Sequence, residues 1–278
     1  CGKSVTSMSI LQLLGSNARI SGGSIKLDGK ELIGLPEKEM CRIRGNDIAM
    51  IFQDPMTALN PTLTIGTQLM EPIMLHQNCG KKEAWTRAVD VLKRVGIAAP
   101  EKRMKEYPHQ LSGGMRQRVM IAMAVSCEPR LLIADEPTTA LDVTIQAQIL
   151  ELMCELREKM GTAIMLITHD MGVVAETADD VLVLYAGKAV EYGSIEDIFE
   201  RPKHPYTQGL LNSIPRLDED VELLNTIEGT VPAPDAMPAG CRFAPRCPYG
   251  KDRCMKEKPG VYHAGNSLVS CFRYEGEK

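Results

Sequence analysis

The chain has 278 residues, which is enough for one large domain or for a main domain with an appendage. An apolar content of 44% allows a sizeable core, whereas an aromatic content of 4% and a net charge of −4 argue against a nucleic-acid-binding surface. No apolar run of about 18 residues or more is present, so the sequence predicts no membrane-spanning helix.

The first residues, CGKSVTSMSI, contain Gly2-Lys3-Ser4 followed by a helical pattern. This is the second half of the phosphate-binding loop G-x-x-x-x-G-K-[ST], in which backbone N–H groups and the lysine hold phosphates and the hydroxyl ligates Mg²⁺. The tripeptide alone is common, so it needs support elsewhere. We expect that the first half of the loop and the strand before it are missing ahead of Cys1. A molecule that truly lacked them would bind ATP weakly.

Alternating patterns then predict a hairpin over residues 23–32, turning at Asp28-Gly29, and a buried strand over 46–52. From residue 70 to residue 95 the pattern is helical. Its apolar stripe contains Trp85, Ala88, Val89 and Leu92.

Residues 130–136 (RLLIADE) and 162–170 (TAIMLITHD) read as buried strands, and residues 145–160 between them as an amphipathic helix. A second hairpin is predicted over 180–193, turning near Ala186-Gly187. This alternation predicts an α/β core with a parallel sheet and antiparallel ribbons.

Two adjacent carboxylates end the strand at 130–136. Asp135 is placed to orient Mg²⁺, and Glu136, one residue further, to polarise a water that attacks a phosphate. The alternative is that both acids cap the turn at Pro137.

The string LSGGMRQR, residues 111–118, predicts a helix that starts at Gly113 with Ser112 as its cap. Gly113 and Gly114 would let the backbone approach an anion at this helix end. An ordinary capped helix is the alternative.

Together these strings resemble the ATP-binding-cassette (ABC) ATPases across residues 1–200. The resemblance adds FQDP with Gln53 as the Q-loop, ALD (residues 140–142) as the D-loop, and ITHD with His169 as the switch histidine. Met115 is a departure, because many relatives carry Gln there. The resemblance implies a P-loop NTPase-type, mostly parallel sheet with an antiparallel β subdomain and a helical subdomain at about 70–127.

The resemblance also implies roles. ATP and Mg²⁺ would bind between two subunits, with the LSGG residues of one facing the nucleotide of the other. Glu136 would activate water, His169 would contact the γ-phosphate, and Gln53 would sense Mg²⁺. The implied Mg²⁺ residues are Ser4, Gln53 and Asp135. The implied nucleotide-binding residues are Gly2, Lys3, Ser4, Val5, Gln53, Ser112, Gly113, Gly114 and Asp135.

Residues 52–73 and 204–215 look like the oligopeptide and dipeptide importer branch, although related nickel importers share these strings. This implies a peripheral motor subunit at the cytoplasmic face of the membrane. Its partners would be a second, paralogous ATPase subunit, two transmembrane permease subunits and, indirectly, an extracytoplasmic solute-binding protein. Nickel or another small solute as cargo, and a non-transport ABC ATPase, are the alternatives.

Composition changes near residue 200, where we place the start of a short, irregular, Pro-rich C-terminal extension over 201–278. Its four cysteines are Cys241, Cys247, Cys254 and Cys271. Their spacing leaves disulfides, zinc, an iron–sulfur cluster and free thiols open. Some dipeptide-importer ATPases that this tail resembles carry a [4Fe–4S] cluster at such a set, which makes a structural cluster our expectation.

Overall fold

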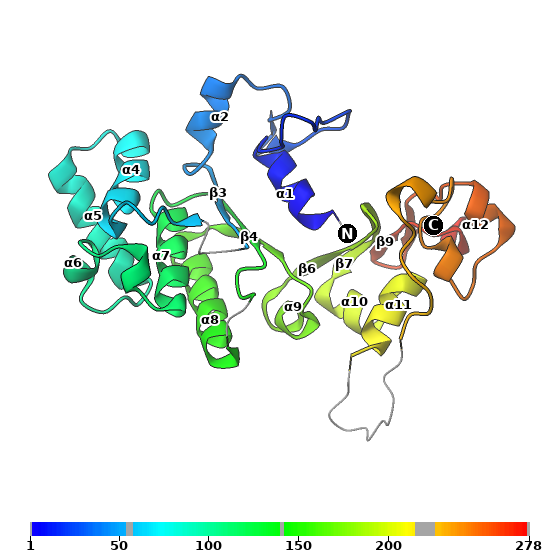
Figure 1. Cartoon of the computed structure of the whole chain (residues 1–278). Helices are drawn as coiled ribbons and strands as arrows, with labels where there is room; N and C mark the ends of the chain where they lie inside the picture. The colour runs from blue at the N-terminus through cyan, green and yellow to red at the C-terminus, as the bar shows by residue number, and fades with distance from the viewer. Residues whose placement is uncertain (1, 54–57, 140–141, 215–225, 277–278) are drawn as a thin grey trace. The chain divides into compact units, whose positions relative to one another are not determined.

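The computed structural model of the chain describes residues 2–53, 58–139, 142–214 and 226–276 (Figure 1). The chain divides into two compact units, Ser4–His169 and Asp170–Lys278 with Cys1–Lys3. The boundary placed near residue 200 from composition stays a prediction. Among the described helices, none combines the length and hydropathy needed to cross a bilayer.

The unit Ser4–His169 is built on a three-stranded parallel sheet in the order β3 (Ile48–Ile51), β4 (Leu131–Asp135), β5 (Ala163–Ile167). Strand β4 is the central one, and Leu132, Ile133 and Ala134 are fully buried in it. The three predicted strands are therefore confirmed. Strand β5 differs in burial, because it pairs only with β4 in the described part of the sheet and leaves Met165 39% exposed.

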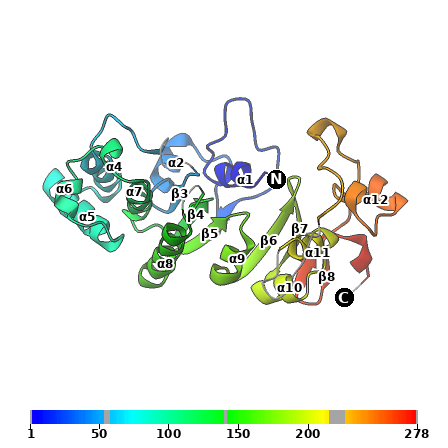
Figure 2. The ribbon, with the colours of Figure 1, turned by 60° about the horizontal axis from the view of Figure 1, so that its bottom comes forward.

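A group of helices packs beside this sheet (Figure 2): α4 (Ile65–Gln77), α5 (Lys81–Arg94), α6 (Pro100–Arg103) and α7 (Gly113–Val125). The helical pattern expected over 70–95 is two helices, because Asn78 leaves α4 with a left-handed φ of 47° and Gly80 caps α5. The apolar stripe of α5 packs into the core as predicted, with Trp85 half-buried at its edge. Helix α8 (Val143–Met160) adds its own apolar face to the same core.

A smaller core in this unit joins the N-terminal elements to the sheet. These elements are α1 (Lys3–Ile10), the strands β1 (Lys26–Leu27) and β2 (Lys30–Glu31), and α2 (Glu37–Ile43). The predicted first hairpin is confirmed, because β1 and β2 pair around Asp28 and Gly29, both at positive φ.

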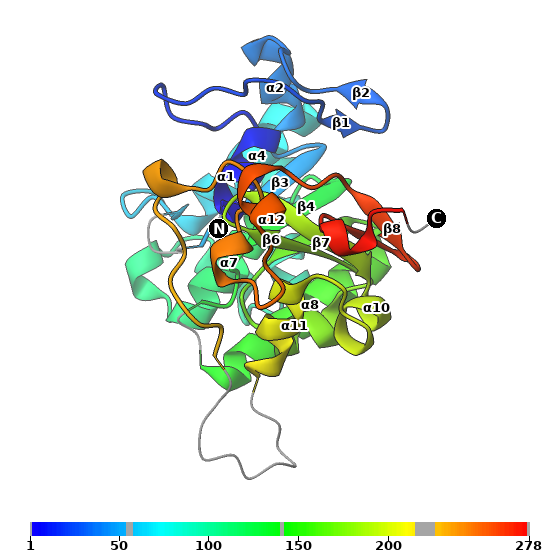
Figure 3. The ribbon, with the colours of Figure 1, turned by 90° about the vertical axis from the view of Figure 1, so that its right-hand side faces the viewer.

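The second unit is organised by the predicted antiparallel ribbon of β6 (Asp180–Tyr185) and β7 (Lys188–Ser194), which turns at Ala186-Gly187. A late hairpin, β8 (Tyr262–Ala264) and β9 (Ser267–Val269), extends this sheet to the order β6-β7-β9-β8. The short helices of this unit are α9 (Met171–Thr177), α10 (Ile195–Glu200), α11 (Pro205–Asn212) and α12 (Asp252–Lys256). Figure 3 shows α10, α11 and α12 from the side of the C-terminal extension.

The C-terminal extension shares its core with the ribbon. Tyr185 and Val190 of the ribbon pack with Ile198 and with Phe243, whose ring lies 5.1 Å from that of Tyr185. A Pro-rich segment with few apolar residues cannot bury enough surface alone, so this shared core is what orders it.

Candidate functional site

Three residues singled out from the sequence meet where the three parallel strands end. Gln53 follows β3, Glu136 follows β4 and His169 follows β5. The carboxyl ends of parallel strands share one edge of a sheet, where ligands usually bind in α/β folds. Short loops after adjacent strands thus bring together residues that are 83 and 33 positions apart in the chain.

The carboxylate of Glu136 is the centre of this group. Its Oε2 accepts hydrogen bonds from Nε2 of Gln53 at 2.9 Å and from the hydroxyl of Thr139 at 3.0 Å. Its Oε1 lies 3.1 Å from Nδ1 of His169. The Glu136 side chain is 17% exposed and that of His169 is 72% exposed. The group is therefore open to solvent on the histidine side, and a reactant can reach it there.

The backbone fixes where Glu136 points. Its φ of 48° is in the left-handed region, which costs free energy for a residue other than glycine. Its N–H donates to the carbonyl of Ile167 at 2.8 Å, so the loop stays attached to β5. On the other side, the amide of Gln117 in α7 donates to the carbonyl of Pro137. This loop is held from both the sheet and α7.

Asp135, one residue earlier, has a different environment. It is the last residue of β4 and is 3% exposed, and its Oδ1 has no hydrogen-bond partner among the described residues. A buried, unpaired carboxylate oxygen is costly unless a cation or a donor reaches it. Carboxylate oxygens are the ligands that Mg²⁺ prefers, so Asp135 fits the magnesium role expected for it.

The residues expected to hold phosphates begin α1. Gly2 has a φ of 88°, Lys3 is the first helical residue, and Ser4 is half-buried with its carbonyl accepting from the Ser7 hydroxyl. Val5 is 58% exposed. Their geometry suits a phosphate at a helix N-terminus. The division between the units falls between Lys3 and Ser4, so the expected convergence of Lys3 with Asp135 and Glu136 stays a prediction.

The LSGG residues start α7 as predicted. Ser112 caps the helix by accepting the Met115 N–H at 3.3 Å. Gly113 is exposed and has open space around its Cα, whereas Gly114 lies against Ile145 of α8. An exposed donor-rich helix start is available to a group outside this chain.

Of the expected D-loop, Ala140 and Leu141 lie outside the described residues. Asp142 caps α8, with its carboxylate accepting the Ile145 N–H at 2.9 Å.

Two supporting residues were missed by the sequence reasoning. Thr139 contacts Glu136 through a turn of three residues, and turn residues of this kind carry a weak local signal. Gln117 lies inside the LSGGMRQR string but was not singled out, because nothing local shows that a helix glutamine points inward to Pro137.

In the second unit, the four cysteines of the extension line a single cavity of about 80 Å³ together with His204, Phe243 and Lys251. Burial raises the pKa of the Cys241, Cys247 and Cys271 thiols, and the neighbouring thiols raise it further. Four thiols are the right kind of ligand for a soft metal or an iron–sulfur cluster. Within the described residues, however, no three Cys, His, Asp or Glu side chains converge closely enough to hold a metal ion.

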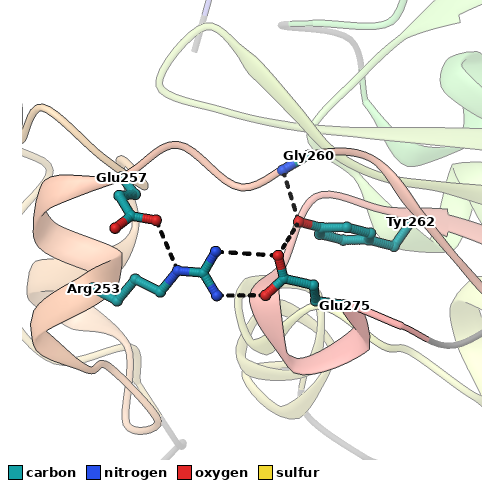
Figure 4. A network of polar contacts seen from close by, with 5 residues as sticks. All are labelled: Arg253, Glu257, Gly260, Tyr262 and Glu275. Carbon is teal, nitrogen blue, oxygen red and sulfur yellow. Dashed lines mark hydrogen bonds and ion pairs between the residues drawn. The ribbon is translucent and has the colours of Figure 1, made fainter.

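The segments that carry these cysteines are held together independently of any metal. The Cys241 N–H donates to the Cys254 carbonyl at 2.7 Å. Figure 4 shows Arg253, which donates to both oxygens of Glu275 and to Glu257, and Tyr262, which also contacts Glu275. The Arg253 guanidinium also lies 4.1 Å above the Phe272 ring, beside Cys271. These contacts connect α12 to the last residues of the chain.

Two known protein families match parts of the chain. Residues 1–139 match the family described as "ABC transporter", and residues 190–254 match "Oligopeptide/dipeptide transporter, C-terminal region". The chain belongs to the ABC transporter family. Its α/β fold, ATP-binding cassette and capacity for ATP hydrolysis follow from this membership, and Mg²⁺ is expected with ATP.

Relatives of this ABC ATPase are similar over almost its whole length. The oligopeptide transport ATP-binding protein AppD of Bacillus subtilis is 57% identical over 99% of this chain and 85% of its own. The dipeptide transport ATP-binding protein DppD of the same organism is 54% identical over 98% and 82%. The solved dimeric structure of MJ0796, a bacterial ABC transporter cassette, has a TM-score of 0.61 at 29% identity, covering 70% of this chain and 81% of its own.

Proposed function

We propose that this ABC ATPase is the motor subunit of an importer for dipeptides or oligopeptides. The observation that carries the catalytic part is the Glu136 carboxylate, which Gln53, Thr139 and His169 surround at the ends of three parallel strands. The cargo rests on the relatives named as peptide transport proteins and on the match of residues 190–254.

In the proposed cycle, Lys3 and the first N–H groups of α1 bind the ATP phosphates, while Ser4, Gln53 and Asp135 hold Mg²⁺. Mg²⁺ neutralises developing phosphate charge. Glu136 accepts a proton from the attacking water, and His169 contacts the γ-phosphate. Ser112, Gly113 and Gly114 donate to ATP bound on a second subunit, which agrees with the exposure of Ser112 and Gly113 here. ATP binding then closes the pair, and hydrolysis reopens it.

The proposed partners are a paralogous ATPase subunit and two transmembrane permease subunits, with a solute-binding protein acting on the far side of the membrane. The chain would lie at the cytoplasmic face as a peripheral subunit. Nickel or another small solute remains the rival cargo, because cargo is chosen by the other subunits.

The test uses the full-length subunit assembled with its permeases in liposomes. Glu136→Gln is expected to bind ATP and dimerise but to release no phosphate, whereas Glu158→Gln, the same change on the exposed side of α8, is expected to hydrolyse normally. Phosphate release by Glu136→Gln at the wild-type rate would remove Glu136 from this role. ATP-dependent uptake of nickel, with no uptake of labelled dipeptides or oligopeptides, would refute the proposal that peptides are the cargo.

We further propose that Cys241, Cys247, Cys254 and Cys271 bind a structural [4Fe–4S] cluster, with zinc as the alternative. The support is the shared cavity of the four thiols, with Lys251 and Arg273 on its wall to offset the negative charge of a four-thiolate cluster. The ligands would have to move together on binding, since they do not form a ready metal group. Protein purified without oxygen is expected to be brown and to contain iron and acid-labile sulfide.

Cys241→Ser is expected to lose the iron, whereas Cys41→Ser, at an exposed thiol in the other unit, is expected to keep it. Colourless wild-type protein with one zinc ion per chain would refute the cluster for that preparation.

A further inference from the structure

Thr139 is bound to Glu136 twice. Its hydroxyl donates to Oε2 at 3.0 Å, and its backbone N–H donates to the Glu136 carbonyl at 3.2 Å. The side-chain contact is therefore made within one tight turn, so its geometry is set locally and needs no distant element to stay in place.

The other two neighbours of the carboxylate come from distant loops. Gln53 and His169 follow different strands, and His169 is 72% exposed. In the proposed cycle each of them also contacts Mg²⁺ or the γ-phosphate, so each would turn away from Glu136 when nucleotide binds. Of the three neighbours of the carboxylate, Thr139 is the one to which the proposed cycle gives no contact with Mg²⁺ or phosphate.

We propose that Thr139 is a positioning residue for Glu136, which holds Oε2 through the cycle while Oε1 takes the proton of the attacking water. This inference rests on the proposed role of Glu136. The water oxygen forms a bond to the γ-phosphorus and passes its proton to Oε1, while the bond from that phosphorus to the bridging oxygen breaks and ADP leaves with the electron pair. Thr139 takes part in none of these bonds, because it fixes the direction of the carboxylate.

The physical reason is that a general base acts only from a defined position. A carboxylate held by one fixed donor keeps one rotamer, whereas a free carboxylate on a surface loop samples several. A positioned acid or base contributes roughly 10²–10⁴-fold to a rate, so loosening it removes part of that factor.

The experiment compares Thr139→Val with Thr139→Ser in the full-length subunit assembled with its permeases. The valine has the shape of threonine without the donor, and the serine keeps the donor. We expect Thr139→Val to lower kcat for ATP about tenfold or more with KM nearly unchanged. Thr139→Ser should recover most of kcat.

A matched control and the Glu136→Gln variant separate this inference from the proposed function. Thr144→Val makes the same change on the exposed side of α8 and should leave kcat unchanged. If Glu136→Gln is inactive but Thr139→Val hydrolyses ATP like the wild type, the inference is wrong and the role of Glu136 stands.

If Thr139→Ser is as slow as Thr139→Val, the hydroxyl is not positioning the base and the inference is overturned. Wild-type turnover by Glu136→Gln would overturn both proposals.

Discussion

Replacing Gln117 with leucine tests whether α7 supports the loop that carries Glu136. Gln117 is 2% exposed, and its amide donates to the carbonyl of Pro137, which is also buried. Leucine has a similar volume but no donor, so the Pro137 carbonyl would be left without this partner. A buried acceptor that loses its donor costs about 1–3 kcal/mol, and we expect the free energy of unfolding to fall by that amount.

The same change should slow catalysis, because Pro137 directly follows Glu136. A displacement of about 1 Å in a reacting group can cost about 10²-fold in rate. In Gln117→Leu the Glu136 N–H would still donate to the Ile167 carbonyl, so the loop should move by less than about 1 Å. We therefore expect kcat to fall about tenfold with KM for ATP unchanged.

Urea unfolding of the full-length protein and steady-state ATP hydrolysis by the assembled transporter measure the two effects. Gln148→Leu is the matched control, because Gln148 is exposed on α8 and loses only a solvent-exposed hydrogen bond from Arg118, so it should change stability by no more than about 0.5 kcal/mol. If the Gln117→Leu protein is as stable and as active as this control, the hydrogen bond to Pro137 contributes to neither stability nor catalysis.

Three further changes test other parts of the structure. A Cβ at Gly66 would lie 2.6 Å from the Met104 carbonyl oxygen, so Gly66→Ala should lower the free energy of unfolding in urea by about 1–3 kcal/mol, while Gly22→Ala, in open space, should not. A Cβ at Gly240 would lie 2.3 Å from the Cys254 carbonyl oxygen, so Gly240→Ala should separate these segments and reduce the iron retained after gel filtration; unchanged iron would contradict this. Burial lowers the pKa of His204 from 6.5 to about 4, so the unfolded chain takes up a proton first and stability falls by about 3 kcal/mol as pH drops from 6.5 to 4. His204→Asn keeps an acceptor for the Tyr206 N–H and should show a flatter pH dependence of the urea midpoint; an equal slope would exclude His204 as its source.

Much of the fold could be predicted because its signals are local. The strands around Ile51, Asp135 and Ile167 are short apolar runs, and the turns at Asp28-Gly29 and Ala186-Gly187 need residues that accept a positive φ. Gln53, Glu136 and His169 were also predictable as a group, because each directly follows such a strand. The burial of β5 was not, since a run of apolar residues does not say how many neighbours a strand has.

The supports of the site and the order of the C-terminal extension depended on contacts that no local pattern contains. Gln117 reaches a carbonyl 20 residues away, and Arg253 reaches Glu275 over 22 residues. Such pairs form only when separate elements pack, so their partners are decided by tertiary structure.

The sequence by itself determined the family, the strand ends and the chemistry of the residues that follow them, because motif strings and periodicity are written within about ten residues of chain. Only the tertiary structure decided that Gln117 holds the Glu136 loop, that Asp135 is buried with an oxygen unpaired among the described residues, and that β9 extends the β6–β7 ribbon. Those features arise from close packing of segments distant in sequence, where shape and burial select each partner.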